Sequence, residues 1–487
     1  MWLAAATLAG CAVGPEYLTP IPSLPLRWSS DGTKQTPKPP NLSHWWVRLN
    51  DPLLNALMEA AVASNLDVAT SKARIREARS TQRQASAGLL PSITGSGSAT
   101  TNKSSASSLD GVASDITADP YNLFQAGFDS SWEFDLFGGN RRGVEAARRG
   151  IEASEDDLQA TLLTLVGDVA SYYVDARGYQ ARIALARRTA ASQRETAVLT
   201  RTKFNAGTSS AVDVAKAVAQ ASSTEANIPS YESNYAIDVH RLGVLLGREP
   251  LALAQALDRP APIPSPRLPL PKGIPADILL NRPDVRAAER RLAQATAKIG
   301  QAEAALYPDV SLTGSVSTSA LKIGDLAKSS SIGWSFGPSV SVPVFDGGKL
   351  RAAVEGSQAQ RDQYHIAFRA AVLGALEDVE NASVSLGREQ IRIRSLTESA
   401  NNYREAARLS RSLYQNGSSS FLDVLDSERS LYSSQDSLLQ SRTTVAKNYI
   451  ALAKALGGGW DGTIDSMKPE VADINTGPHL APLRLAK

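Results

Sequence analysis

The residues best suited to catalysis or metal binding are few and widely separated in this 487-residue chain. No two of its four histidines have the spacing that would bring them to one metal ion; they are His44, His240, His365 and His479. The chain has one cysteine, Cys11, which excludes a disulfide framework or a multi-cysteine metal site. It also lacks a Walker sequence and therefore an energy source of its own. We expect a protein that is not an enzyme, with no catalytic residues, no metal and no cofactor.

The chemistry expected of Cys11 is lipidation, because it ends a short apolar stretch at the start of the chain. Residues 1–10 are apolar or small, as in a secretory signal peptide. The letters LAGC at 8–11 resemble a bacterial lipobox, whose cysteine becomes the lipid-modified N-terminus. Ala12 follows, and by resemblance to lipoprotein sorting rules it favours the outer membrane. The alternative is an ordinary signal peptide with an incidental cysteine.

The composition favours long helices and gives no sign of nucleic-acid binding. Hydrophobic residues make up 43% of the chain, charged residues 21% and aromatic residues 6%, and the net charge is +2. A surface for nucleic acid would need a clear basic excess, so we expect no such partner. After the N-terminus no apolar run reaches the roughly 18–20 residues of a membrane-spanning helix. Insertion into a membrane would therefore rely on strands or on a lipid.

An internal repeat organises the chain. FNAGTSSAVDV at 204–214 resembles YQNGSSSFLDV at 414–424, an offset of 423 − 213 = 210, and FGGNRR at 137–142 resembles FDGGKLR at 345–351. The segment between the copies is crowded with proline. Chance similarity of two alanine-rich helical regions is the alternative. We predict a signal peptide at 1–10, a lipidated extended segment at 11–52, a first repeat at 53–248, a linker at 249–275, a second repeat at 276–460 and a tail at 461–487.

Each copy contains long helices with a narrow apolar seam. Apolar residues step alternately by four and three, as in a coiled coil; they include Leu158, Leu162, Leu165, Val169, Tyr172, Ala176, Tyr179, Ile183 and Ala186, and Phe368, Val372, Ala375, Val379, Ala382, Leu386, Ile393, Leu396, Ala400, Tyr403 and Ala407. Gly207 and Gly417, with polar neighbours, are the natural points of reversal. We predict one antiparallel helical hairpin per copy, with a first arm of about 60 residues, or about 90 Å.

Between the helices the periodicity changes to two. In the predicted strand Ser331–Phe345, apolar residues such as Trp334 and Phe336 alternate with serine and glycine. The other copy alternates in the same way around Phe128 and Trp132, and a shorter partner strand is expected upstream in each copy. An apolar face opposite a small and polar face is typical of membrane β-barrel strands. An amphipathic soluble sheet is the alternative.

Four strands are too few to close a barrel. Bacterial barrels have eight or more strands, and an open edge in lipid would leave backbone N–H and C=O groups without partners. If these strands lie in a membrane, several copies of the chain must share one barrel.

The order of these elements resembles the TolC/OprM outer-membrane factors. The motifs that carry the resemblance are Cys11, FDGG at 345–348, Gly417, LDVLD at 422–426 and ALGGGW at 455–460. The last motif and the lipobox are most similar to the NodT-like efflux lipoproteins. The resemblance implies an internally duplicated α+β membrane protein: a trimeric outer-membrane β-barrel, four strands per protomer, continued by a long periplasmic α-helical barrel.

The resemblance also assigns roles near the second hairpin turn. Leu422, Asp426 and Arg429 resemble the constriction and its salt-bridging positions in the OprM branch. Asp423 and Asp426 resemble the acidic rings of TolC. Acids repeated around a threefold axis focus negative potential in a narrow mouth, which attracts cations.

Two further residues, Tyr414 and Asp213, resemble members of a tie that holds the inner and outer coils of the family together. The third member of that tie falls on Ser419 instead of an arginine, so the same latch is incomplete here and Arg429 is the candidate to supply the charge. An aspartate just after a helical turn is also commonly a helix cap.

The resemblance implies a passive exit duct of a tripartite efflux pump. Its expected partners are two further copies in a homotrimer, outer-membrane lipid, an inner-membrane RND transporter and a periplasmic adaptor protein at the tips near Gly207 and Gly417. The alternatives are a type I secretion channel and a periplasmic coiled-coil spacer without a pore.

Overall fold

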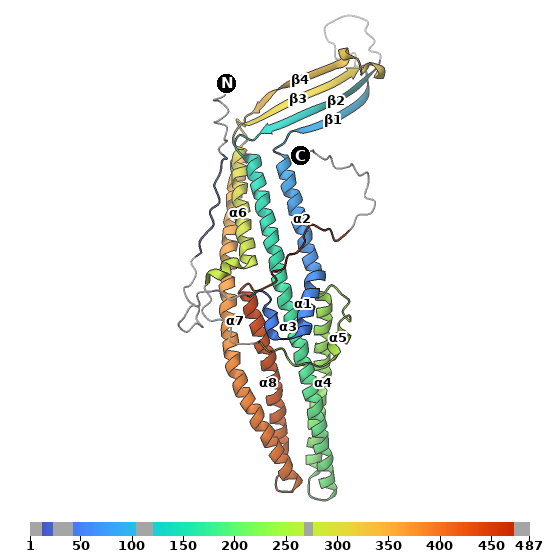
Figure 1. Cartoon of the computed structure of the whole chain (residues 1–487), viewed down its shortest axis with the longest axis vertical. Coiled ribbons are helices and arrows are strands. Elements are labelled where there is room, and N and C mark those ends of the chain that lie inside the picture. Colours follow the sequence, from blue (N-terminus) through green and yellow to red (C-terminus); the bar gives the residue numbers. More distant parts are fainter. Residues whose placement is uncertain (1–11, 23–41, 104–119, 267–275, 472–487) are drawn as a thin grey trace. The chain divides into compact units, whose positions relative to one another are not determined.

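The computed structural model describes residues 12–22, 42–103, 120–266 and 276–471, so Cys11 and the predicted signal peptide lie outside the described residues. The described chain is mostly helical with one four-stranded sheet (Figure 1). None of its described helices is long and apolar enough to span a membrane. The principal elements are α1 (Pro52–Ser64), α2 (Leu66–Ala87), β1 (Ser92–Asn102), β2 (Tyr121–Phe134), α3 (Gly139–Asn205), α4 (Ala211–Leu245), α5 (Ala254–Asp258), α6 (Pro283–Ala304), β3 (Asp309–Ala320), β4 (Ile332–Ser341), α7 (Lys349–Gln415) and α8 (Phe421–Ala455).

The long helices match each other in length. α3 and α7 both have 67 residues, more than the predicted 60, and α4 and α8 both have 35. Each pair begins 210 residues apart, the offset of the sequence repeat. At about 1.5 Å per residue, α3 and α7 each contain about 100 Å of helix. The predicted linker also contains the short helix α5.

The described segments form two compact units. Unit 1 comprises Met1–Ile21, Ile75–Ser154 and Ala288–Phe368 in their described parts and contains the sheet. Unit 2 comprises the described parts of Pro22–Arg74, Glu155–Ala287 and Arg369–Lys487. Each unit combines segments from both predicted repeats.

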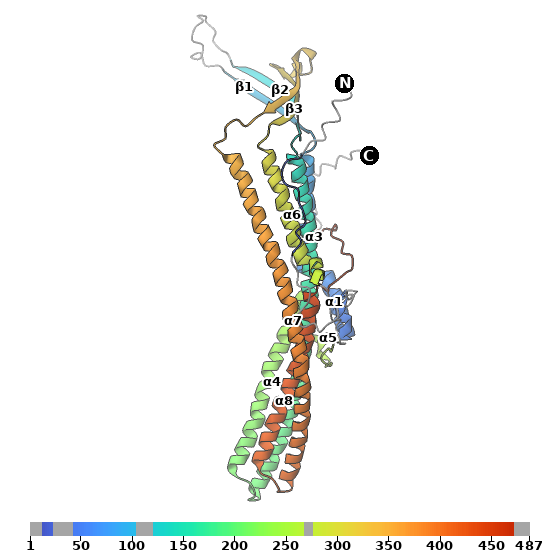
Figure 2. The same ribbon diagram turned by 90° about the vertical axis from the view of Figure 1, so that its left-hand side faces the viewer.

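The sheet is antiparallel throughout, in the order β1-β2-β3-β4, and Figure 2 shows it from a second side. Phe128 pairs with Val316, and Val316 pairs with Trp334, so these side chains share one face. The next register position places Asp129, Ser315 and Ser335 together on the opposite face. The predicted separation into an apolar and a polar face is therefore confirmed across three strands.

The predicted end of the last strand is wrong. β4 stops at Ser341, and not at Phe345, because its partner β3 begins at Asp309, the residue that pairs with Ser341. Val344 lies beyond the strand and is 91% exposed. Trp334 and Phe336, inside the strand, are 79% and 71% exposed.

The helical seams are buried largely as predicted. α7 buries the predicted positions Phe368, Val372, Ala375, Val379, Ala382, Leu386, Ala400 and Ala407, but Ile393 and Leu396 are only partly buried and Tyr403 is 41% exposed. On α3, Tyr172 and Tyr179 are only partly buried, whereas their neighbours Val166 and Tyr173 are fully buried. The buried face of α3 is wider than a coiled-coil seam because α3 contacts several other elements, including the cap of α1 through Tyr173 and the end of α5 through Arg177.

The first described residues of unit 1 are fixed to its helices. Val13 donates its N–H to the carbonyl of Phe137 at 3.0 Å, and Arg142 donates to the carbonyl of Val13 at 3.2 Å. Gly14 has a φ of +89°, and a Cβ there would lie 2.3 Å from the Cα of Gly300. Only glycine allows this close approach, so the segment after Cys11 is held beside the end of β2.

A buried carboxyl group lies among the helices of unit 2. Asp238 on α4 is 8% exposed, and its Oδ2 has no hydrogen-bond partner among the described residues. Burial, and then the charge of nearby Asp175, raise the pKa of Asp238 from 3.8 to about 7, while Lys447 opposes the shift. Lys447 is itself paired with Asp175 at 2.6 Å. Asp238 is therefore a cost to stability whenever it is ionised.

This raised pKa predicts a specific loss of stability with pH. Because the native state holds the Asp238 proton more tightly than the unfolded chain, stability falls as pH rises from about 4 to about 7. At pH 8, Asp238→Asn should raise the free energy of unfolding by on the order of 2 kcal/mol and therefore raise the melting temperature. At pH 4 it should leave the melting temperature unchanged. The exposed Asp362→Asn serves as the control. Equal melting temperatures of wild type and Asp238→Asn at pH 8 would contradict the assignment.

Candidate functional site

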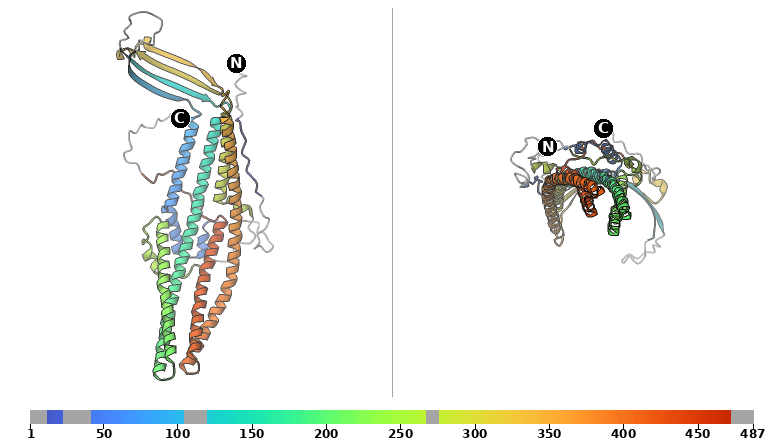
Figure 3. Two further views of the ribbon diagram at one scale, coloured as in Figure 1. Left: turned by 180° about the vertical axis from the view of Figure 1, so that it is seen from behind. Right: turned by 90° about the horizontal axis from the view of Figure 1, so that it is seen from below.

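The two helical hairpins of unit 2 place their turns at the same end, as Figures 1 and 3 show. Gly207 and Gly417 lie in these turns with φ of +73° and +80°, and a Cβ at either position would have no neighbour within 4 Å. Glycine is therefore favoured here by the backbone conformation alone. The N–H groups of the two glycines close the ends of α3 and α7 by donating to the carbonyls of Phe204 and Tyr414. Both predicted points of reversal are confirmed.

Asp213 and Asp423 begin the returning helices in the same way. Each accepts a hydrogen bond from the backbone N–H of the serine three residues earlier, Ser210 or Ser420, at 3.1 Å, and that serine accepts the aspartate N–H in return. Hydrogen bonds from Ser419 and then Ser420 hold the pKa of Asp423 below its usual value. Both acids are thus helix caps that stay ionised.

The other predicted constriction residues lie at the start of α8. Leu422 is 60% exposed, and Asp426 and Arg429 are exposed as well. Within the described chain neither Asp426 nor Arg429 has a hydrogen-bond or ion-pair partner, whereas Tyr414 bonds to Thr200 and Asp213 to Ser210.

Tyr414 links the two hairpins, but through a different partner. Its hydroxyl donates to the Thr200 hydroxyl on α3 at 3.2 Å, and its ring packs edge-on against Phe421. Lys203 lies over the same ring with its Nζ 4.9 Å from the centroid. Asp213, the tie partner suggested by the resemblance, caps its own helix instead.

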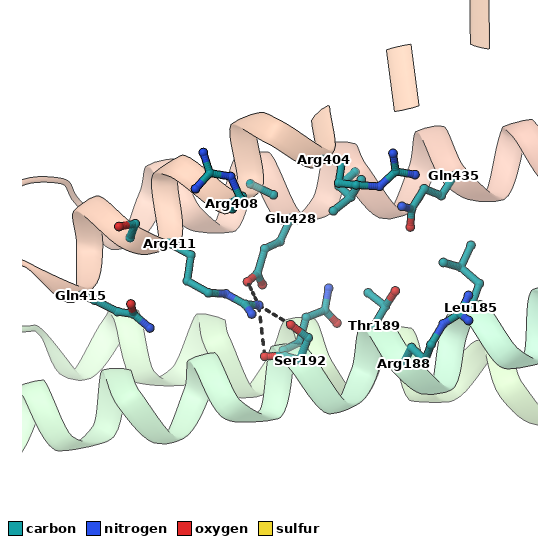
Figure 4. A pocket seen from close by; sticks show the side chains of 14 residues that line it. Leu185, Arg188, Thr189, Ser192, Arg404, Arg408, Arg411, Gln415, Glu428 and Gln435 are labelled. Carbon is teal, nitrogen blue, oxygen red and sulfur yellow. Dashed lines mark hydrogen bonds and ion pairs between the residues drawn. The ribbon is translucent and has the colours of Figure 1, made fainter. Parts of the chain in front are cut away.

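An ion pair within the second hairpin, which the sequence did not reveal, also binds α3 of the first hairpin through hydrogen bonds; it lies one helical turn before Tyr414. Arg411 on α7 pairs with the buried Glu428 on α8 at 2.5 Å and also donates to Ser192 on α3. Glu428 accepts a second hydrogen bond from Thr196 on α3 at 3.0 Å. Figure 4 shows Arg411 reaching across toward both Glu428 and Ser192. We call this group, Ser192, Thr196, Arg411 and Glu428, the inter-hairpin tie.

A second ion pair joins the hairpins directly, farther from the turns. Arg182 on α3 donates twice to Asp436 on α8, at 2.7 and 3.0 Å. The guanidinium of Arg182 also lies 4.1 Å from the ring centroid of Tyr231 on α4. The fork geometry and the partial burial make this pair stronger than an exposed single contact.

The sequence did contain a signal for Glu428. It follows Phe421 and Val424, both buried, at helical spacing of seven and four, so an acid occupies the apolar stripe of α8. The equivalent position of the first copy is Val218, so comparing the repeats gives no second acid to draw attention to it. The acid of the tie therefore occurs in the second hairpin only.

Comparison with known proteins supports a functional assignment. The family described as Outer membrane efflux protein matches residues 57–248 and 274–458. The chain is 37% identical over 460 residues to Nodulation protein T of Rhizobium leguminosarum bv. trifolii, covering 93% of this chain and 96% of that protein. It is 31% identical over 462 residues to the Solvent efflux pump outer membrane protein SrpC of Pseudomonas putida, covering 93% and 96% of the two chains.

The fold is also similar to a solved channel. The outer-membrane channel OprN superposes with a TM-score of 0.84 at 34% identity, covering 92% of this chain and all of that one. The similarity thus extends over both strand pairs and both hairpins. On these matches the chain belongs to the Outer membrane efflux protein family, and it is an outer-membrane exit duct for efflux.

Proposed function

We propose that three copies of this chain form one passive, trimeric duct. Their sheets would close a twelve-stranded barrel in the outer membrane, and their hairpins would form a helical barrel through the periplasm. The matching lengths of α3 with α7 and α4 with α8 support an origin by internal duplication. Small molecules would pass through the shared interior without any chemical step.

One observation carries this proposal: the sheet has an exposed apolar face and two open edges. Phe128, Trp334 and Phe336 are 61%, 79% and 71% exposed on that face. β1 and β4 each pair with one strand only within the described chain. Hydrocarbon would suit the face but not the edges, whose N–H and C=O groups need strand partners. If the edge strands of neighbouring copies pair in a closed ring, every edge gains a strand partner and the apolar face can still contact lipid.

Lipid attachment at Cys11 would add a second membrane contact. The residues directly after it, Val13 and Gly14, are fixed beside Phe137 at the end of β2. An acyl chain on Cys11 would therefore be close to the strands proposed to enter the membrane.

The proposed gate lies at the turn end of each hairpin. Leu422, Asp423, Asp426 and Arg429, repeated three times around the axis, would line a narrow and negatively charged mouth. Opening requires the hairpins to separate, so the inter-hairpin tie and the Arg182–Asp436 pair favour the closed arrangement.

The expected partners follow from the same geometry. The turns around Gly207 and Gly417 are exposed and have open space beside the backbone, which suits end-on contact with a periplasmic adaptor. An inner-membrane RND transporter would supply the energy, since the duct has no energy source of its own.

Charge removal at the gate tests the proposed duct. Asp423→Ala with Asp426→Ala should raise the closed-state conductance in planar bilayers and roughly halve the preference for cations, because the acidic ring is lost. The measurement is single-channel current and reversal potential across a salt gradient. Unchanged currents and selectivity would contradict the gate assignment, and no current from wild type would contradict the duct itself.

A matched variant separates charge from structure in that test. Ser420→Ala keeps both carboxylates but removes the hydroxyl that caps α8, at a cost of about 1 kcal/mol. It should leave the cation preference intact. The same selectivity loss in Ser420→Ala would show that loosening of the turn, and not charge, causes the effect.

Weakening the inter-hairpin tie should favour opening. Glu428→Gln keeps the shape of the side chain but removes the charge that accepts the Thr196 hydroxyl of α3 and holds Arg411 beside Ser192, a loss of about 1.5 kcal/mol per protomer. The expected result is a higher open probability in bilayers. Glu405→Gln is the control, because Glu405 pairs with Arg408 on its own helix. Equal open probabilities in the two variants would contradict a role for the tie.

A further inference from the structure

A cavity of about 710 Å³ lies between the two hairpins, next to the inter-hairpin tie. Its walls come from α3 of the first hairpin and from α7 and α8 of the second. Figure 4 shows polar and charged side chains on both sides of it. This volume is ample for a small molecule, and the walls belong entirely to unit 2.

The cavity has an excess of positive charge. Four arginines line it, against one acid, Glu428, which is already paired with Arg411. Arg408 is likewise paired with Glu405. Arg188 and Arg404 are not neutralised: Arg404 donates to the neutral side chain of Asn401, and Arg188 has no partner among the described residues. They lie on opposite walls, Arg188 on α3 and Arg404 on α7 (Figure 4).

A buried amide on α3, the helix that carries Arg188, lacks hydrogen-bond partners. Gln193 on α3 is 2% exposed and lines the cavity, yet neither its Nε2 nor its Oε1 has a hydrogen-bond partner among the described residues. Leaving such groups unsatisfied typically costs about 1–3 kcal/mol each. A polar group bound in the cavity would remove that cost. Leu185 and Leu431 provide apolar surface beside it.

We propose that this cavity binds a small molecule through an anionic oxygen group, a phosphate or a carboxylate. Arg188 and Arg404 would pair with the anion from opposite walls, since guanidinium groups match both oxyanions in geometry. The Gln193 amide would donate a hydrogen bond to it or to a neighbouring polar atom. The apolar wall would hold an organic portion where the molecule has one.

Such a ligand would act on the hairpins as well as occupy the space between them. Because Arg188 and Arg404 belong to different hairpins, an anion bound to both would hold the hairpins together. This step rests on the proposed function, in which separation of the hairpins opens the duct. The binding itself does not depend on it.

Binding is tested on the purified full-length protein in detergent by calorimetric titration with inorganic phosphate, and separately with succinate. We expect saturable binding of at least one probe, with one site per chain and no equivalent signal from chloride. Tighter binding of phosphate or of succinate identifies the preferred oxyanion. Arg188→Ala and Arg404→Ala should each weaken the affinity about tenfold, the usual effect of losing one charge-assisted contact.

Two matched variants keep the test specific. Arg187→Ala removes the adjacent arginine, which pairs with Glu232 outside the cavity, and should leave the affinity unchanged. Gln193→Leu fills the same space without polar atoms; it should weaken binding even where it stabilises the fold. Absence of saturable binding of both probes would overturn the proposal, as would equal losses in Arg187→Ala and Arg188→Ala.

The effect on opening is measured independently in planar bilayers. The probe that binds should lower the open probability of wild type and leave that of Arg188→Ala with Arg404→Ala unchanged. If wild type conducts and binds the probe without any change in open probability, the bridging role is wrong. If wild type never conducts, the proposed duct fails while the calorimetric result still decides the anion site.

Discussion

The sheet imposes the constraint on which the interpretation of the whole molecule depends. Each pair of neighbouring strands is hydrogen-bonded in an antiparallel register, but β1 and β4 each leave one side without a partner strand in the described chain. Its apolar side chains are exposed together on one face, where water would be an unfavourable neighbour. A trimeric assembly is proposed because it meets both requirements at once.

The repeated architecture could be predicted because its signals are local and occur twice. The seam on α7, the reversals at Gly207 and Gly417 and the two-residue alternation in the strands depend on residues close together in sequence. Two local details were missed. β4 ends at Ser341, opposite the first residue of β3, and Tyr403 is exposed although Ala400 and Ala407 on either side of it in the seam are buried.

The contacts between hairpins could not be predicted with the same success, because they join residues about 200 positions apart. The resemblance suggested Tyr414 and Asp213 as members of one tie; in the described chain Tyr414 donates to Thr200 of the other hairpin, and Asp213 caps its own helix. Ser419, where the family pattern has an arginine, donates to Asp423 and reinforces the cap. A charged side chain does reach the other hairpin three residues before Tyr414, where Arg411 donates to Ser192. A single sequence shows that Ser419 stands where an arginine was expected, but it does not show a contact between residues 219 positions apart.

The fixed position of Val13 and Gly14 would limit how an acylated chain is placed in the bilayer. Val13 is hydrogen-bonded beside the end of β2, and only Ala12 separates it from the cysteine. At about 3.5 Å per residue, the two residue steps that separate Val13 from the lipid attachment point span at most about 7 Å. A linker this short would allow the protein little movement along the bilayer normal. The acyl chains would therefore help to fix how deeply the strands lie in the membrane.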